Sequence, residues 1–151
     1  KSVEVIGERA FYNCPKLNSV KFSDGSKVIE YMAFYKCPEL SRVEFSNGLK
    51  EIGRSAFMLC KKLDQVVFPE GLEKIGSNAF RVCEGLTSIQ LPAEISEVGD
   101  HAFAFCYGLR EVKLPNHLDS YNTFQECTSL TEVTIPEGYT EMELSVTLGT
   151  R

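Results

Sequence analysis

The chain has 151 residues, of which 43% are hydrophobic and 25% are charged, and its net charge at pH 7 is -5. This composition predicts an ordered globular chain and excludes a disordered one. The acidic balance argues against nucleic acid or an anionic membrane as a partner, because both need clustered Lys and Arg. The apolar stretches are shorter than a membrane span, so no transmembrane segment is expected.

Six cysteines recur along the chain at a nearly constant spacing. Gaps of 23, 23, 23, 23 and 21 residues separate Cys14, Cys37, Cys60, Cys83, Cys106 and Cys127. A fixed period of this length predicts a repeat protein whose units stack on one another. We expect one domain over residues 1–151 with about six units, and a degenerate last repeat or C-terminal cap over 137–151. The chain starts in the middle of a unit, which predicts that it is part of a longer protein.

Each unit carries the same apolar positions in the same order. Read from the cysteine, the pattern is C-x-x-L-x-x-[VI]-x-[FLI]-[PS]-x-x-L-x-x-I-G-x-x-A-F-x-x. Apolar residues two apart, as at Val20 and Phe22, followed by Ser or Pro, predict a short strand. The L-x-x-I-G segment predicts a second extended stretch, and G-x-x-A-F-x-x-C predicts one or two helical turns. The sequence therefore indicates an α/β repeat solenoid with parallel strands about 4.8 Å apart and short helical turns opposite them.

The unit resembles the 23-residue BspA-type leucine-rich repeat, also called the Treponema pallidum type. The resemblance covers residues 3 to about 142, with five nearly complete units and a shortened sixth. It implies a right-handed coil with the strands on the concave face, in a bacterial cell-surface or extracellular protein that takes part in adhesion and protein binding. Fold alone does not establish function, so these remain expectations.

Two interpretations of the cysteines stay open. An even number of cysteines in a surface protein is compatible with disulfides. Equivalent residues in stacked strands lie about 4.8 Å apart, however, which exceeds the usual Cβ separation across a disulfide. The spacing therefore favours reduced thiols that act as small core residues. A straight row of thiols does not surround a zinc ion tetrahedrally, so no metal site is expected.

No set of residues in the sequence matches a known catalytic pattern. His101 and His117 are the two histidines, and neither lies in a metal-binding motif such as H-E-x-x-H. There is no glycine-rich phosphate loop and no G-x-S-x-G motif. We therefore expect a non-enzymatic protein without a cofactor.

The outward residues of the predicted strands form two columns. The first column contains Ser19, Arg42, Gln65, Ser88, Glu111 and Glu132, and the second contains Lys21, Glu44, Val67, Gln90, Lys113 and Thr134. Eight central members are the candidate protein-binding residues: Arg42, Glu44, Gln65, Val67, Ser88, Gln90, Glu111 and Lys113. The alternative is a solvated surface, because these columns are poor in the aromatic residues that dominate interface energetics.

A second candidate surface lies at the predicted helical turns. Leu59, Val82 and Phe105 occupy the same position in three successive units. If exposed, they form an apolar patch for self-association or docking. If they pack beneath the helical turns, they are core residues. Further along, two residues are missing between Pro115 and Phe124, which predicts a local change of curvature around 116–121.

Two functions remain possible at this point. The first is a cell-surface interaction or adhesion module that binds a protein through the strand-lined face, with a host matrix or surface protein as one candidate partner. The second is a structural spacer or stalk that presents another domain and has no ligand of its own. A variant with altered strand-face charges distinguishes them, because only the binding module loses a partner.

Overall fold

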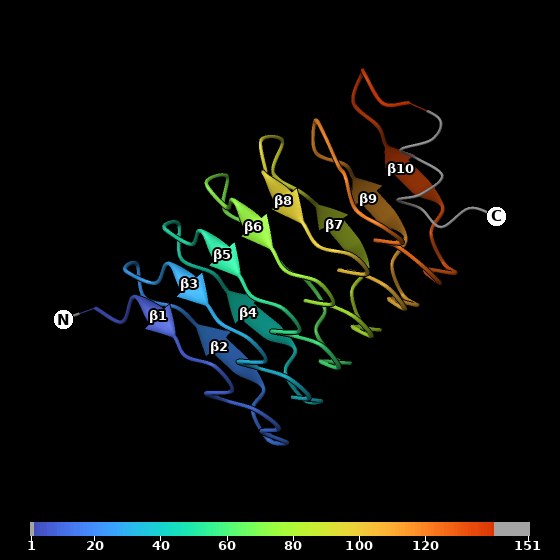
Figure 1. The fold of residues 1–151 in the computed structure, drawn as a ribbon. Coiled ribbons are helices and arrows are strands. Elements are labelled where there is room, and N and C mark those ends of the chain that lie inside the picture. The colour runs from blue at the N-terminus through green and yellow to red at the C-terminus, as the bar shows by residue number, and fades with distance from the viewer. Residues whose placement is uncertain (1, 141–151) are drawn as a thin grey trace.

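The computed structural model describes residues 2–140, which contain ten short strands that all pair in parallel. Paired residues differ by 23 in number, as in Val5↔Val28 and Ile52↔Ile75, except between β9 and β10, where they differ by 21, as in Val112↔Val133. The chain is therefore a β-solenoid, and the predicted stack of about six parallel-stranded units is confirmed. We number the coils 1 to 6 over residues 5–27, 28–50, 51–73, 74–96, 97–117 and 118–140. Figure 1 shows them in a row from the N-terminus in blue to the C-terminal coil in red.

The strands of the coils form two separate surfaces, although not every coil adds a strand to both. The five-stranded sheet, called here the continuous sheet, contains β1 (Val5–Ile6), β3 (Val28–Ile29), β5 (Glu51–Ile52), β6 (Lys74–Ile75) and β8 (Glu97–Val98). The strand face contains β2 (Ser19–Lys21), β4 (Arg42–Glu44), β7 (Ser88–Gln90), β9 (Glu111–Lys113) and β10 (Glu132–Thr134). The predicted strand at V-x-F and the predicted extended stretch before I-G are both present.

A row of stacked phenylalanines fills the core between these surfaces. Successive rings of this row lie 5.1 to 5.6 Å apart, and their planes agree within 11°. The members of the row are Phe11, Phe34, Phe57, Phe80, Phe103 and Phe124. Phe57 and Phe80 are fully buried, whereas Phe11 at the N-terminal end is 43% exposed. Each coil thus buries its apolar side chains mainly against its two neighbours, as in other solenoids.

The predicted helical turns are wrong, since residues 2–140 contain no helix. The segment from Gly53 to Cys60 instead makes successive tight turns, in which Ala56 N–H donates to Gly53 O and Cys60 N–H donates to Phe57 O. Phe57 N–H donates across to Ala79 O of the next coil at 2.8 Å. Parallel backbone pairing between coils therefore replaces the hydrogen bonds within a segment that a helix needs.

Positive backbone φ angles make these turns possible. Two residues in each coil have φ near +55°, one before the Ala-Phe pair and one after it, such as Ser55 and Leu59 in coil 3. A positive φ at the third residue of a four-residue turn is typical of type II turns. All twelve of these positions carry a residue other than glycine, which is why the sequence did not reveal the turns.

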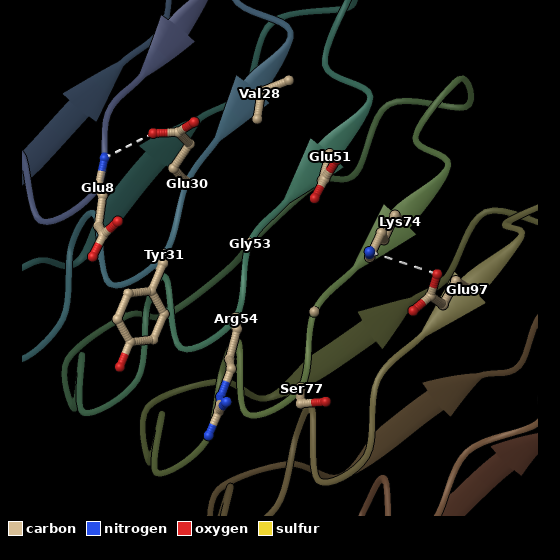
Figure 2. A pocket seen from close by; sticks show the side chains of 11 residues that line it. Glu8, Val28, Glu30, Tyr31, Glu51, Gly53, Arg54, Lys74, Ser77 and Glu97 are labelled. Atoms are coloured by element: carbon tan, nitrogen blue, oxygen red, sulfur yellow. Dashed lines mark hydrogen bonds and ion pairs between the residues drawn. The ribbon is translucent and has the colours of Figure 1, made fainter.

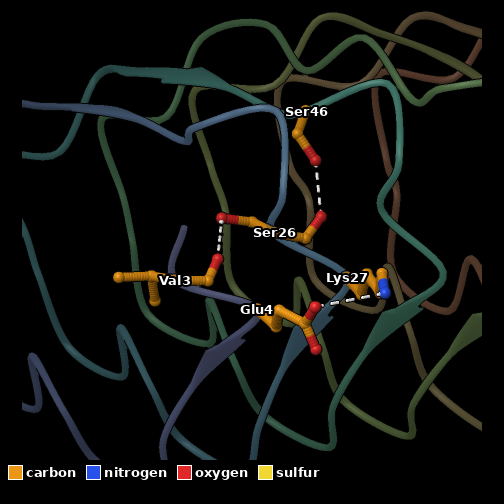
Figure 3. A network of polar contacts seen from close by, with 5 residues as sticks. All are labelled: Val3, Glu4, Ser26, Lys27 and Ser46. Carbon is orange, nitrogen blue, oxygen red and sulfur yellow. Dashed lines mark hydrogen bonds and ion pairs between the residues drawn. The ribbon is translucent and has the colours of Figure 1, made fainter. Parts of the chain in front are cut away.

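The loops after the strand face change along the chain. In coils 1 and 2, Ser26 Oγ donates to Val3 O at 3.0 Å and Ser46 Oγ donates to Ser26 O at 2.5 Å, so buried serines link successive coils (Figure 3). From coil 3 onward, Pro69 and its equivalents take the place after the strand. The stack thus combines two loop types, and the change falls at coil 3.

The C-terminal part of the described chain departs from the regular pattern. The continuous sheet ends at β8, and residues 116–121 form no strand, in agreement with the missing two residues. Tyr121 N–H instead donates to Asp100 Oδ1 at 2.7 Å. Residues 137–140 form a turn and the end of coil 6; the rest of the predicted cap, 141–151, lies outside the described residues. Within 2–140 no helix has the length and apolarity to cross a membrane.

Candidate functional site

The strand face presents the two predicted columns side by side. Backbone pairing aligns Ser19 with Arg42 and Lys21 with Glu44, and an isolated bridge aligns Arg42 with Gln65. Further along, the same pairing aligns Ser88, Glu111 and Glu132, and also Gln90, Lys113 and Thr134. Among the column residues Glu44 alone is half-buried, and the others are exposed. The structure therefore places all eight candidate binding residues on one surface.

Charge is distributed unevenly over this surface. In coils 1 and 2, the Glu44 carboxylate forms an ion pair with Arg42 at 2.8 Å and a longer one with Lys21 at 3.6 Å. In coils 5 and 6, Glu111, Lys113 and Glu132 form no ion pair within the described part of the chain. The column residues in the middle of the surface are uncharged, although Asp64 and Glu70 line the hollows beside them. These column residues are Gln65, Val67, Ser88 and Gln90.

Val67 is the exception among these side chains. It is 81% exposed, which is the largest value among the exposed large hydrophobic residues. One hollow of about 280 Å³ lies between Val67 and β7, and another of about 500 Å³ lies between Val67 and β4. In the sequence analysis Val67 is a member of a column and has no special role. What distinguishes Val67 in the sequence is that it is the one apolar residue among the outward positions of both columns.

A second hollow feature, which we call the furrow, crosses the continuous sheet (Figure 2). Gly53 and Gly76 form part of its floor, and a Cβ at Gly76 would lie 2.5 Å from the backbone nitrogen of Arg54. The coils approach too closely there for a side chain. The furrow has a volume of about 500 Å³ and carries both signs of charge, including Glu51 and Lys74. The close approach of neighbouring coils at these glycines therefore accounts for the furrow.

Glu30 stands where most other coils have this glycine. Its Oε2 accepts a hydrogen bond from the backbone N–H of Glu8 at 3.0 Å. The carboxylate therefore satisfies a backbone donor of coil 1. This contact gives the departure from the repeat pattern a structural reason.

Leu59, Val82 and Phe105 lie next to one another in the turns and are all half-buried. The structure thus supports neither full burial beneath helical turns nor a fully exposed patch. The Arg81 guanidinium lies 4.8 Å from the centre of the Phe105 ring and covers part of it. Tyr107 contacts Phe105 edge-on at 6.2 Å. Docking or self-association through these residues stays a prediction.

The cysteines form a row of hydrogen-bond donors. All six are free thiols; five are buried, and Cys14 in the first coil is half-buried. The Sγ of Cys60 donates to Phe34 O at 3.1 Å and that of Cys83 donates to Phe57 O at 3.2 Å. Cys37, Cys106 and Cys127 make the same contact. The thiol therefore has a structural role that a purely apolar residue does not reproduce.

Hydrogen bonds between neighbouring thiols lower the pKa of Cys37 and Cys127, but burial has the largest effect on the pKa of Cys83 and Cys106. It raises the pKa of Cys83 and of Cys106 well above the ordinary value for cysteine, because a thiolate is poorly solvated in the core. A nucleophilic cysteine needs the opposite environment. Within residues 2–140 there is also no group of three or more His, Cys, Asp or Glu side chains placed to hold a metal ion.

The fold and its surfaces define a β-solenoid repeat protein. The repeat matches the BspA type leucine rich repeat region in six copies, over residues 1–110 and 50–148. The chain therefore belongs to this family, and the resemblance inferred from the sequence is confirmed. A comparison with curated protein sequences finds no match.

Solved structures of the same fold come from several bacteria. The leucine rich repeat protein of T. pallidum is 35% identical, with a TM-score of 0.86 over 89% of this chain and 64% of that one. A leucine-rich repeat protein from Bacteroides ovatus is 28% identical, with a TM-score of 0.74 over 89% of this chain and 41% of that one. A leucine rich cell surface protein from Faecalibacterium prausnitzii is 27% identical, with a TM-score of 0.75 over 86% and 35% of the two chains. The chain thus spans less than two thirds of each of these proteins.

Proposed function

We propose that the chain is a non-enzymatic module of a cell-surface protein and that it binds a protein partner through the strand face. The observation that carries this proposal is the alignment of the two outward columns by backbone pairing over coils 1 and 2 and over coils 4 to 6, with a stacked core beneath them. A surface of fixed spacing, long in one direction, suits recognition of another protein. The location rests on family membership and on the relative described as a cell surface protein.

The test exchanges charges without changing net charge. A fourfold variant carries Arg42→Glu, Glu44→Lys, Glu111→Lys and Lys113→Glu. Wild type and variant are immobilised and exposed to host matrix proteins and serum, and the retained proteins are then identified and titrated. We expect the variant to lose at least about tenfold in affinity for a partner that the wild type retains, because like charges then face each other.

Separate controls test whether the fourfold variant stays folded and whether its effect is specific to the strand face. Exposed ion pairs contribute little to folding, so the melting temperature of the fourfold variant should equal that of wild type. Glu51→Lys combined with Lys74→Glu makes a comparable charge exchange on the continuous sheet and should leave binding unchanged. A solenoid that retains no partner in any of these media supports the alternative, a spacer without its own ligand.

A further inference from the structure

The backbone pairing of the strand face is interrupted between coils 3 and 4. β2 and β4 form one small sheet, and β7, β9 and β10 form another. Between the other coils of the described chain a hydrogen bond of the type Arg110 N–H to Thr87 O is always present, whereas the type Leu91 N–H to Lys113 O is also missing between coils 2 and 3, at Phe45 N–H. Within the described residues, the equivalent bonds from Thr87 N–H and from Phe68 N–H to the neighbouring coil are missing. The continuous sheet is unbroken here, since β5, β6 and β8 pair in register.

A change in the core coincides with the place where both types of bond are missing. The last apolar residue of each strand is Phe in coils 1 to 3, and it is Leu or Ile in coils 4 to 6. The ring of Phe45 packs edge-on against one ring of the central row, that of Phe57. Phe68 meets both Phe80 and Phe103, at 5.6 and 6.3 Å. The ring of Phe68 therefore extends toward the coils with smaller residues, next to the place where the backbone bonds are missing.

The interruption leaves a recess at the middle of the strand face, which we call the junction and define by Gln65, Val67, Ser88 and Gln90. It includes the hollow of about 280 Å³. Val66 and Phe68 also line this hollow although their side chains are 93% buried in the core. Their backbone atoms therefore face the hollow. Exposed Val67, unpaired backbone groups and side-chain amides thus lie together, without a charged side chain among the four.

We propose that the junction is the central contact of the strand face and that it takes an extended, uncharged segment of a protein partner. The segment places an apolar side chain against Val67, and its peptide groups bond the Gln65 and Gln90 amides and the unpaired backbone. The hollow is smaller than a typical pocket for a whole small molecule and fits one or two side chains. This inference rests on the proposed function and specifies where on the strand face the binding energy is concentrated.

The charge pattern favours this occupant over a charged one. An interface commonly has a desolvated centre with a polar, charged rim. The junction matches the centre, while the Arg42–Glu44 pair on one side and Glu111 with Lys113 on the other match the rim. Glu70 also lines the hollow and is exposed, so an acidic segment would be repelled, and a basic one would lose hydration for only a weak, solvent-screened ion pair.

The test uses a displayed library of linear peptides, about as long as the strand face is wide, as the probe. Peptides selected on the wild-type solenoid are synthesised and titrated by calorimetry against Val67→Asp and Gln90→Ala. We expect enriched peptides to share an apolar residue flanked by uncharged ones. Val67→Asp should weaken them by at least about tenfold, which corresponds to loss of one buried apolar contact. Raising the salt concentration from about 50 to about 300 mM should change affinity less than about threefold, since no ion pair is involved.

Val5→Asp provides the matched control, because Val5 is also an exposed valine, at 47%, and lies on the continuous sheet. It should leave binding unchanged. Selected peptides that are highly charged, salt-sensitive and indifferent to Val67→Asp overturn the inference while leaving binding through the strand face intact. Peptides indifferent to both Val67→Asp and the fourfold charge variant overturn the inference and the proposed function together. A library without enrichment, combined with binding of glycans to the wild type, overturns the protein segment as occupant.

Discussion

At the scale of single residues, the repeat position and not the residue type decides the local conformation. Leu59, Val82 and Phe105 have φ of 65°, 61° and 60°, although branched and bulky residues avoid this region. Asn13 occupies the same position in coil 1 with φ of 52°. Asparagine tolerates this conformation better than valine does. The stack therefore imposes a backbone that some of its own side chains disfavour.

This strain predicts a stabilising substitution. Val82→Asn should raise the free energy of unfolding by about 0.5 to 1 kcal/mol, because relief of the left-handed conformation exceeds the loss of a half-buried apolar side chain. Urea denaturation with an unchanged m-value measures the effect. Val112→Asn, at a strand position that is only 2% exposed, should instead destabilise by about 2 kcal/mol. A Val82→Asn protein no more stable than wild type contradicts the prediction.

The buried thiols predict a loss of stability at alkaline pH. In the unfolded chain a thiol ionises near pH 8.5, whereas burial raises the pKa of Cys83 and Cys106 in the folded chain. Between these two pKa values the unfolded state binds fewer protons than the folded state. The free energy of unfolding should therefore be independent of these groups below about pH 8 and should fall above about pH 9, by about 1.4 kcal/mol per pH unit for each thiol.

The slope of stability against pH between about 9 and 10.5 measures this effect. Cys83→Ala combined with Cys106→Ala should reduce the slope, even if the variant is less stable at neutral pH. Cys14→Ala, at the half-buried position of the first coil, should change it least. An unchanged slope in the double variant would show that the buried thiols do not control the alkaline transition.

At the scale of elements, the sequence predicts the strands well and the turns poorly. The alternation at Val20 and Phe22, repeated every 23 residues, reports burial directly, and this is why the paired registers follow from counting. The A-F-x-x-C spacing looks helical because its apolar residues are three apart. In the structure those side chains point inward from tight turns held by hydrogen bonds to the next coil. Such bonds depend on partners 22 residues away and leave no local trace in the sequence.

The candidate site, too, could be predicted from the sequence only in part. The two columns of the strand face could be predicted, because outward positions follow from the strand period. The junction could not, because Gln65 to Phe68 keep the repeat pattern, and the missing backbone bonds beside Phe68 leave no mark in that pattern. A change from Phe to Leu at one core position is visible in the sequence, but the interruption of backbone pairing beside it is not.

Hydrogen exchange tests the interruption directly. The amides of Thr87 and Phe68 lack the partners that Arg110 and Leu91 have in equivalent positions. We expect Thr87 and Phe68 to exchange at least about a hundredfold faster than Arg110 and Leu91, measured by NMR in native conditions. Gly76, which donates to Ile52 O at 2.7 Å on the continuous sheet between the same coils, should stay protected. Equal protection of all four strand-face amides would contradict an open junction.

At the scale of the whole molecule, stability is distributed along one axis. Each coil contacts its neighbours, so the cost of a core substitution depends on how many neighbours the residue has. Phe57 is fully buried between Phe34 and Phe80, with ring distances of 5.1 and 5.2 Å. Phe11 has one stacked neighbour at 5.1 Å and is 43% exposed. The same residue type in the same repeat position therefore experiences two different environments.

We predict that Phe57→Ala lowers the free energy of unfolding by about 3 to 5 kcal/mol, as expected for a large cavity in a packed core. Phe11→Ala should cost about 1 kcal/mol, because part of its surface is already in water and a single ring contact is lost. Chemical denaturation of both variants measures the difference. The comparison also bears on function, because the strand face keeps its spacing only while the central coils stay stacked. Equal destabilisation by the two substitutions would mean that the solenoid unfolds as one unit insensitive to position, and it would remove the basis for treating the central coils as the rigid support of the junction.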